Sequence, residues 1–396
     1  MANVSSSNGI EYLPKIRFSG FPFEWEDCVL STVLAERKEY CEKDGTYEHA
    51  TLSKDGIYGK TERYNRDFLV SDENKAYKIT HRWDLCYNPA NLKFGVICLN
   101  TYGDAIFSPI YVTFDISESF SKEFIGYALS RWDFINRALR FQQGTVYERM
   151  AVSPEDFLTI HCRFPKLKEQ EKIADFLRLI DQRIAKQSEH VEHLKKYKRG
   201  LLQAIFSREV QLENLSNWEH RLFSEIASLG KGKYTPKQEE ALPCIELEHL
   251  EQQTGQIIGY ANSNEQNSVK SVFHKGDVLF GKLRPYLRKF ALPEYDGVCS
   301  SEIWVLHPES NIDSTFLFYL IQSESFIAAA NISSGTKMPR AEWSKVSNES
   351  FFIPELSEQK RIADLFSAID KRIVNASRSV NKMQSLKQGL LQQLFI

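Results

Sequence analysis

Features typical of secreted, membrane and metal-binding proteins are missing from this sequence of 396 residues. No stretch approaches the roughly 18 consecutive apolar residues that a membrane-spanning helix needs. Residues 1–10 are polar and do not follow the pattern of a secretory signal. The seven cysteines are scattered without a Cys-x-x-Cys pair, which indicates reduced thiols rather than a disulfide framework or a zinc module. We therefore expect a cytoplasmic protein without a bound metal or a membrane association.

The sequence also lacks a strong net charge. It contains 50 Lys and Arg and 52 Asp and Glu, which gives a formal net charge of −2 at pH 7. Any binding of nucleic acid must therefore depend on local basic patches. The composition is otherwise that of a globular protein, with 42% hydrophobic and 26% charged residues, which excludes a wholly disordered or collagen-like chain. A chain of this length is long enough for more than one folded unit.

Sequence signatures of catalysis are absent as well. There is no Walker-type phosphate loop, no nucleophile elbow and no acidic pair followed by Glu-x-Lys as in many nucleases. The segment 88–91 (Asn-Pro-Ala-Asn) lacks the second proline and the aromatic residue with which amino-methyltransferases hold a flipped adenine. We therefore expect a protein that is not an enzyme and binds no cofactor of its own.

The sequence contains a tandem repeat. Residues 164–206 align without gaps to residues 353–395, with 19 identities at an offset of 189. Weaker matches precede each copy at offsets that fall from 193 to 191, as small loop deletions in a duplicated sequence would leave. A repeat of this period indicates the domain organisation of the chain independently of any single motif. We predict two globular regions, each followed by a helical segment.

Each helical copy carries one narrow apolar stripe. Apolar residues recur at alternating steps of four and three, which is the seam spacing of a coiled coil. The residues predicted to pair the two helices are Ile173, Leu177, Ile180, Ile184, Val191 and Leu194 in the first copy and Ile362, Phe366, Ile369, Ile373, Val380 and Met383 in the second. We expect the two copies to pair as an antiparallel coiled coil; alternatively, each helix packs on its own domain.

The regions between the helices are predicted to be α+β. Short strand-like runs at 94–99, 110–114, 277–280 and 302–306 are bounded by turn residues, and helical runs are expected at 121–140 and 313–330. The predicted boundaries are 1–163 for the first domain, 164–207 for the first helix, 208–352 for the second domain and 353–396 for the second helix.

Basic and polar residues gather in loops at matching places of the two regions. Cations of this kind contact phosphates, and Arg, Asn, Gln and Tyr side chains read the edges of bases. The candidates in the first region are Lys54, Lys60, Arg63, Tyr64, Arg66, Asn88, Asn91, Lys93 and Arg149. Those in the second region are Lys231, Lys233, Tyr234, Lys282, Arg284, Tyr286, Arg288, Lys337 and Arg340. Each alone is typical of a solvated loop, and the paired arrangement is what favours nucleic-acid binding.

The repeated motifs resemble a known family. Two copies of Pro-x-Leu-x-Glu-Gln-x-x-Ile-Ala-Asp, at 165–175 and 354–364, each precede a heptad helix that ends in Gly-Leu-Leu-Gln. Together with the run at 275–287 (KGDVLFGKLRPYL), they resemble the specificity subunit of type I restriction-modification systems. One departure is Trp83, where the second copy has Gly276, which we expect to change that turn.

The resemblance implies a non-catalytic, DNA-binding subunit with two target-recognition domains, each reading one half of a bipartite site in double-stranded DNA. It further implies that the helices fix the spacer between the half-sites and dock two modification subunits, which hold S-adenosylmethionine. Restriction subunits acting as ATP- and Mg-dependent translocase-nucleases would complete the complex. Two alternatives stay open: a helical scaffold without DNA specificity, and the specificity subunit of a related methyltransferase-nuclease fusion system.

Overall fold

The computed structural model describes residues 13–42, 45–60, 76–143, 150–209, 218–239, 241–332 and 338–396. These residues form two compact units. Unit 1 extends to Lys186 and also takes in Val380–Ile396, whereas unit 2 comprises Gln187–Ser379. Each of the two long helices therefore contributes one part to each unit.

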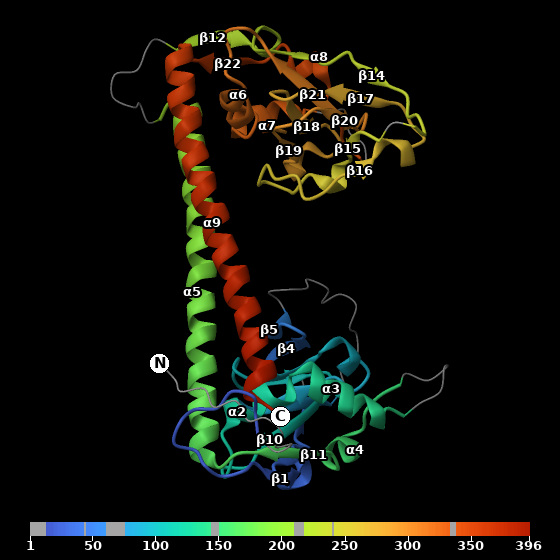
Figure 1. Ribbon diagram of the computed structural model, residues 1–396, viewed down its shortest axis with the longest axis vertical. Helices are drawn as coiled ribbons and strands as arrows, with labels where there is room; N and C mark the ends of the chain where they lie inside the picture. The colour runs from blue at the N-terminus through green and yellow to red at the C-terminus, as the bar shows by residue number, and fades with distance from the viewer. Residues whose placement is uncertain are drawn as a thin grey trace. The chain divides into compact units, whose positions relative to one another are not determined.

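Unit 1 contains three small sheets (Figure 1). The four-stranded sheet has the order β2 (Leu34–Glu36), β10 (Val112–Ile116), β7 (Leu85–Tyr87) and β8 (Ile97–Leu99). The five-stranded sheet has the order β3 (Tyr40–Cys41), β6 (Tyr77–Thr80), β9 (Ala105–Phe107), β4 (Glu48–Ser53) and β5 (Gly56–Gly59). A separate antiparallel pair joins β1 (Glu26–Val29) to β11 (His161–Phe164), which brings both ends of the domain together just before the first long helix.

Unit 2 repeats this topology. Its four-stranded sheet has the order β13 (Ala227–Leu229), β21 (Ile303–Pro308), β18 (Val278–Gly281) and β19 (Phe290–Ala291). Its five-stranded sheet has the order β14 (Lys233–Tyr234), β17 (Lys270–Phe273), β20 (Gly297–Cys299), β15 (Pro243–Ile245) and β16 (Ala261–Asn262). The antiparallel pair is β12 (Glu219–Leu222) with β22 (Ser350–Ile353).

The two units agree strand by strand. Both five-stranded sheets even contain a parallel pair at the same place, β4 with β9 in unit 1 and β15 with β20 in unit 2. The predicted α+β fold class with two tandem domains is confirmed, and the duplication read from the sequence extends to the sheet order.

The short helices correct one expectation. The helical run at 121–140 is divided into α2 (Lys122–Leu129) and α3 (Trp132–Ala138), and the run at 313–330 into α6 (Ser314–Leu320) and α7 (Glu324–Ala330). In unit 2 the break is made by Ser323, whose side chain accepts a hydrogen bond from the Phe326 amide and so starts a new helix. Further short α-helices among the described residues are α4 (Pro154–Leu158) and α8 (Trp343–Val346).

The long helices are α5 (Leu167–Phe206) and α9 (Leu356–Leu394), and within each unit their parts pack antiparallel (Figure 1). In unit 1 the core joins Ile173 and Leu177 of α5 to Leu394 near the end of α9. In unit 2 the core joins Ile362 and Phe366 of α9 to Ile205 of α5. Every predicted helix-pairing residue is buried or half-buried. The alternative also holds in part, because the first turns of each helix pack on their own domain as well.

One ion-pair cluster occurs in both units at repeat-related positions. In unit 1 the Lys387 ammonium lies 2.6 Å from Asp181, which also accepts a hydrogen bond of 2.7 Å from the Tyr127 hydroxyl. In unit 2 the ammonium of Lys198 lies 2.8 Å from Asp370, which the Tyr319 hydroxyl contacts at 2.9 Å. The lysine and the aspartate come from different helices and the tyrosine comes from the domain, so this cluster ties three segments together.

The glutamine of the repeated Glu-Gln pair fastens each long helix to its domain. The Gln170 side chain accepts from the Ser121 amide at 3.0 Å and donates to the Pro165 carbonyl at 2.7 Å. Gln359 does the same in unit 2, accepting from the Asp313 amide at 2.9 Å and donating to the Pro354 carbonyl at 3.0 Å. Ser121 and Asp313 are the N-caps of α2 and α6, so each glutamine holds the entrance of a domain helix against the start of a long helix. This explains why the glutamine of the motif is alike in both copies.

Candidate nucleic-acid interface

In unit 2 a strained basic loop follows strand β18. Arg284 and Arg288 have left-handed backbone conformations, with φ of +52° and +51°, and they flank the short turn Pro285–Leu287. Such conformations are uncommon for residues other than glycine and cluster at functional sites. The turn presents the Tyr286 ring, which is 50% exposed. The loop therefore holds a guanidinium and an aromatic ring at the surface in a defined arrangement.

The backbone around the loop is fixed by the segment that follows residue 337. The Arg284 amide donates to the Pro339 carbonyl at 2.8 Å, and the Ala341 amide donates to the Lys282 carbonyl at 2.9 Å. Arg340 is placed beside the loop by its ion pair with Glu302 at 3.0 Å. The exposed Arg284 guanidinium, in contrast, has no carboxylate partner among the residues that the structure describes. It remains available for a ligand.

Between Lys270 and Lys289, three other cations are engaged within the unit, whereas Lys275 is exposed. Lys270 is buried and contacts Glu246 at 2.5 Å. The Arg288 guanidinium lies 2.5 Å from Glu324, and Lys289 donates to the Leu247 carbonyl. The positive charge that unit 2 offers at this loop is therefore concentrated at Arg284 and Lys282, and is smaller than the sequence suggests.

Part of the segment 230–234 lines a cavity of about 640 Å³ in unit 2. Lys231 and Lys233 border it together with Trp343. The Lys233 ammonium donates to the Ser271 hydroxyl at 3.4 Å, whereas Tyr234 is half-buried. Lys231 and Lys233 are both exposed, so both of these predicted cations are accessible.

In unit 1 the predicted residues around strand β7 have different environments. The Asn88 side chain is buried and its oxygen accepts from the Ala90 and Asn91 amides at 3.1 and 3.2 Å, so it shapes the turn. Asn91 and Lys93 are exposed. Of the other candidates, Lys54 is exposed and Lys60 is half-buried.

Several predicted residues fall in segments that the structure does not describe. They are Arg63, Tyr64, Arg66, Arg149 and Lys337. For these residues, as for the others, DNA contact stays a prediction.

Two exposed aromatic residues beside Lys93 were not predicted. Phe94 is 60% and Trp132 is 56% exposed, and the Lys93 ammonium lies 5.2 Å from the centre of the Phe94 ring. The Trp132 ring lies against Gly95, where a Cβ atom would be 3.4 Å away. Aromatic rings next to cations can stack on bases or cover a sugar. The sequence signal was the placement of Phe94 between Lys93 and Gly95, in a turn rather than in a strand.

The expectation that Trp83 changes its turn is wrong. Trp83 and Gly276 both have positive φ, +77° and +96°, and in both copies the following aspartate accepts from the histidine amide three residues earlier, at 2.8 and 2.6 Å. The aspartate side chain, rather than the glycine, determines this turn. Trp83 is therefore held in a conformation that is strained for a bulky residue.

Among the described residues no group of three His, Cys, Asp or Glu side chains could hold a metal ion. No helix among them is both long and apolar enough to cross a membrane.

Similarities to known proteins agree with this architecture. Residues 216–382 match the family described as type I restriction modification DNA specificity domain. The chain is 30% identical over 190 residues to the type I restriction enzyme EcoDI specificity subunit of Escherichia coli, covering 46% of this chain and 42% of that protein. It is 24% identical over 274 residues to the MjaVIII specificity subunit of Methanocaldococcus jannaschii, covering 61% of this chain and 63% of that protein.

The chain thus spans less than two thirds of the length of these curated relatives. A solved structure described as the S subunit of a type I restriction-modification system from M. genitalium shares the fold, with a TM-score of 0.58 at 17% identity, over 97% of this chain and 99% of that one. The match over residues 216–382, the repeated domain topology and the paired helices lead to one conclusion: the chain contains a region that matches the type I restriction modification DNA specificity domain, and it is similar to type I specificity subunits.

Proposed function

We propose that this chain is the DNA-recognition subunit of a type I restriction-modification complex. Each domain reads one half of a bipartite site in double-stranded DNA, and the long helices set the spacer between the halves. The names of the relatives, which are specificity subunits of type I restriction enzymes, support this assignment. The single observation that carries base reading is the strained loop of unit 2, in which Arg284 is exposed and has no carboxylate partner among the described residues.

The loop has the properties that sequence reading requires. A guanidinium can donate two hydrogen bonds to the O6 and N7 atoms of a guanine, and a rigid backbone reduces the entropy lost when it binds. In unit 1 the surface formed by Asn91, Lys93, Phe94 and Trp132 is the counterpart that we assign to the other half-site, because it combines an amide, a cation and stacking rings.

The chemistry of the complex resides in its partners. In this proposal two modification subunits bring S-adenosylmethionine and restriction subunits bring ATP and Mg, while this chain acts in the cytoplasm without a cofactor or a catalytic group of its own.

Two exposed positions on the long helices fit the docking of two identical partners. Tyr197 on α5 and Leu386 on α9 are both 60% exposed and are related by the repeat offset of 189 residues. Large apolar side chains of this exposure on a helix are typical of interaction sites. Because repeat-related positions offer the same kind of contact twice, two copies of one modification subunit can bind in the same way.

The experiment is a methylation assay with the reconstituted complex, comparing the wild type with Arg284→Ala. Loss of one bidentate base contact costs about 1–3 kcal/mol, which corresponds to about a 5- to 150-fold loss of discrimination. We expect that loss at one half-site only, with the other half read normally. Arg178→Ala is the matched control, because Arg178 is exposed on α5 and contacts Asp175 at 2.7 Å.

Sequencing of methylated adenines in the host, with and without the gene, would supply the site itself. Disappearance of one two-part motif is the expected result. An Arg284→Ala variant that recognises both half-sites normally, or neither, would contradict the assignment of the loop, and the former result would favour a scaffold role. A single partner polypeptide that carries both methyltransferase and nuclease activities would instead identify the related fusion system.

A further inference from the structure

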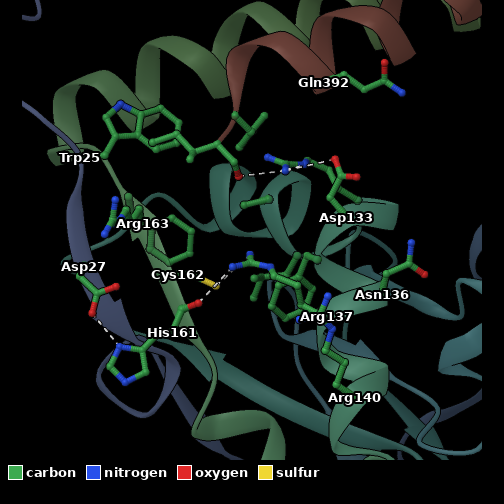
Figure 2. A pocket seen from close by; sticks show the side chains of 17 residues that line it. Trp25, Asp27, Asp133, Asn136, Arg137, Arg140, His161, Cys162, Arg163 and Gln392 are labelled. Atoms are coloured by element: carbon green, nitrogen blue, oxygen red, sulfur yellow. Dashed lines mark hydrogen bonds and ion pairs between the residues drawn. The ribbon is translucent and has the colours of Figure 1, made fainter. Parts of the chain in front are cut away.

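Unit 1 contains a cavity lined by four arginines, which the proposed function does not use (Figure 2). It measures about 610 Å³ and lies between helix α3, the β1–β11 pair and the last turn of α9. The arginines are Arg131, Arg137, Arg140 and Arg163. Figure 2 shows Arg137 of α3 and Arg140 of the 3-10 turn that follows it (Leu139–Phe141), with Cys162 of β11 facing Arg137.

Carboxylates neutralise only part of this charge. Of the two aspartates that line the cavity, Asp27 is engaged with the His161 ring at 2.7 Å. Arg137 donates to the His161 carbonyl at 3.3 Å and to the Cys162 sulfur at 3.8 Å, and its guanidinium lies 5.8 Å from the centre of the Phe134 ring. In the part of the chain that the structure describes, neither Arg137 nor Arg140 has an ion pair with a carboxylate. The cavity therefore carries a local excess of positive charge.

Arg131 has a donor without an acceptor. Its side chain is only 8% exposed, and its Nε–H has no hydrogen-bond partner in the described residues. The other end of the guanidinium donates to the Ile396 backbone oxygen at 3.1 Å and lies 3.5 Å from the exposed Asp133. Burial lowers the pKa of Arg131 because it removes water from the charge. A buried guanidinium in this state is stabilised by an additional acceptor.

The repeat shows that this charge is not required by the fold. The topology of unit 2 is the same, yet the positions that correspond to the four arginines at offsets of 192 and 189 carry no charge. They are Ser323, Ala329, Ile332 and Phe352. Contacts that the two units need in common, such as the Asp-Lys-Tyr cluster, are kept in both copies, whereas the arginines occur in unit 1 alone. We conclude that they serve a purpose other than folding.

A redox role for the cavity is disfavoured by Cys162. Burial raises the pKa of this thiol to about 11, and the nearby Arg137 only partly opposes the shift. The thiol is therefore protonated at neutral pH and is a poor nucleophile. Binding of an anion is the chemistry that the lining supports.

We propose that this cavity binds a phosphate group. Planar guanidinium groups match phosphate oxygens in pairs, and several of them converge here on one space. The cavity is larger than a bare phosphate needs, so the group belongs to a larger molecule, which is either a free phosphate ester or the DNA backbone. Binding of the DNA backbone rests on the proposed function, whereas binding of a free phosphate ester does not.

The test measures binding of inorganic phosphate to the full chain by calorimetry, in the absence of DNA. We expect saturable binding by the wild type, and a rise in Kd of about tenfold or more for Arg137→Gln and for Arg140→Gln, since each removes one charge-assisted contact. Both side chains are exposed, so folding should be retained, which circular dichroism checks. Arg183→Gln is the matched control, because Arg183 is an exposed arginine on α5 away from the cavity lining.

No binding by the wild type, or equal affinity in all variants, would overturn the proposal. A second measurement identifies the source. If the DNA backbone supplies the phosphate, Arg140→Gln lowers the slope of log affinity for duplex DNA against log salt by about one. If a free phosphate ester supplies the phosphate, Arg140→Gln leaves this slope unchanged and still weakens the binding of inorganic phosphate. The calorimetric measurement and the salt dependence of DNA affinity can both be read even if the methylation assay shows no sequence recognition. The phosphate-site proposal and the proposed function can therefore fail separately.

Discussion

Replacing Lys198 with methionine is expected to destabilise unit 2 more than the matched Lys387→Met change destabilises unit 1. The two lysines occupy the same place in the repeated cluster, but their surroundings differ. The Lys198 side chain is 7% exposed and its partner Asp370 is 26% exposed, whereas Lys387 and Asp181 are 23% and 38% exposed. Methionine keeps the length of the side chain and removes the charge, so the comparison isolates the ion pair.

The expected difference follows from burial. A hydrogen bond to a charged group contributes about 1.5–3 kcal/mol when it is shielded from water, and loss of Lys198 leaves a carboxylate in a largely buried position. The Tyr319 hydroxyl continues to donate to Asp370, which limits the cost, so we expect about 2 kcal/mol in unit 2. The more exposed pair in unit 1 is screened by water, and we expect about 1 kcal/mol or less.

Hydrogen exchange measured peptide by peptide suits this test, because each unit can open separately. Faster exchange is expected in α6 and the adjoining part of α9 for Lys198→Met, with unit 1 unchanged. The double variant Lys198→Met with Asp370→Leu should recover much of the loss, since no unpaired charge is left buried. Equal effects of the two lysine changes, or a larger one for Lys387→Met, would refute the reasoning from burial.

Two further predictions concern unit 1 and the helices. Burial lowers the pKa of His81, but hydrogen bonds with Glu39 and Asp104 raise it more, so the net pKa lies above the ordinary 6.5. The contribution of His81 to stability is therefore complete below pH 6.5 and is lost as the pH rises through the raised pKa. The variant His81→Gln should lower the melting temperature at about pH 6 more than at about pH 8.5. An equal loss of melting temperature at both pH values would contradict this prediction. Tyr197→Glu and Leu386→Glu should each remove one modification subunit from the complex in native mass spectrometry, and a full complement in both variants would contradict the docking proposal.

The helices and the repeat were predictable because their signals lie in residue order. The 4-3 spacing and the offset of 189 do not depend on distant parts of the chain. Trp83 shows where this fails: the residue type suggested a different turn, but an aspartate side chain that accepts from a backbone amide fixes the conformation in both copies. The identity of one residue in a turn says little when another residue makes the hydrogen bond that determines it.

The candidate interface was predictable only in outline. Lys270 and Arg288 look free in the sequence, but Glu246 and Glu324, which pair with them, are 24 and 36 residues away. The arginine cavity was missed because the pairing of β1 with β11 brings Arg163 to residues that lie far from it in the sequence. Charge along a chain shows how many cations there are; contacts between distant segments decide which of them remain available.

The division of each long helix between the two units has a consequence for the gene. The contacts that close each unit repeat at the same spacing, with Asp181 and Lys387 in one and Asp370 and Lys198 in the other. Recombination between related genes within the stretches that encode these helices would exchange one whole domain and still join matching contact residues. Under the proposed function, a new pair of half-sites would then arise in a single crossover, without a sequence of compensating mutations.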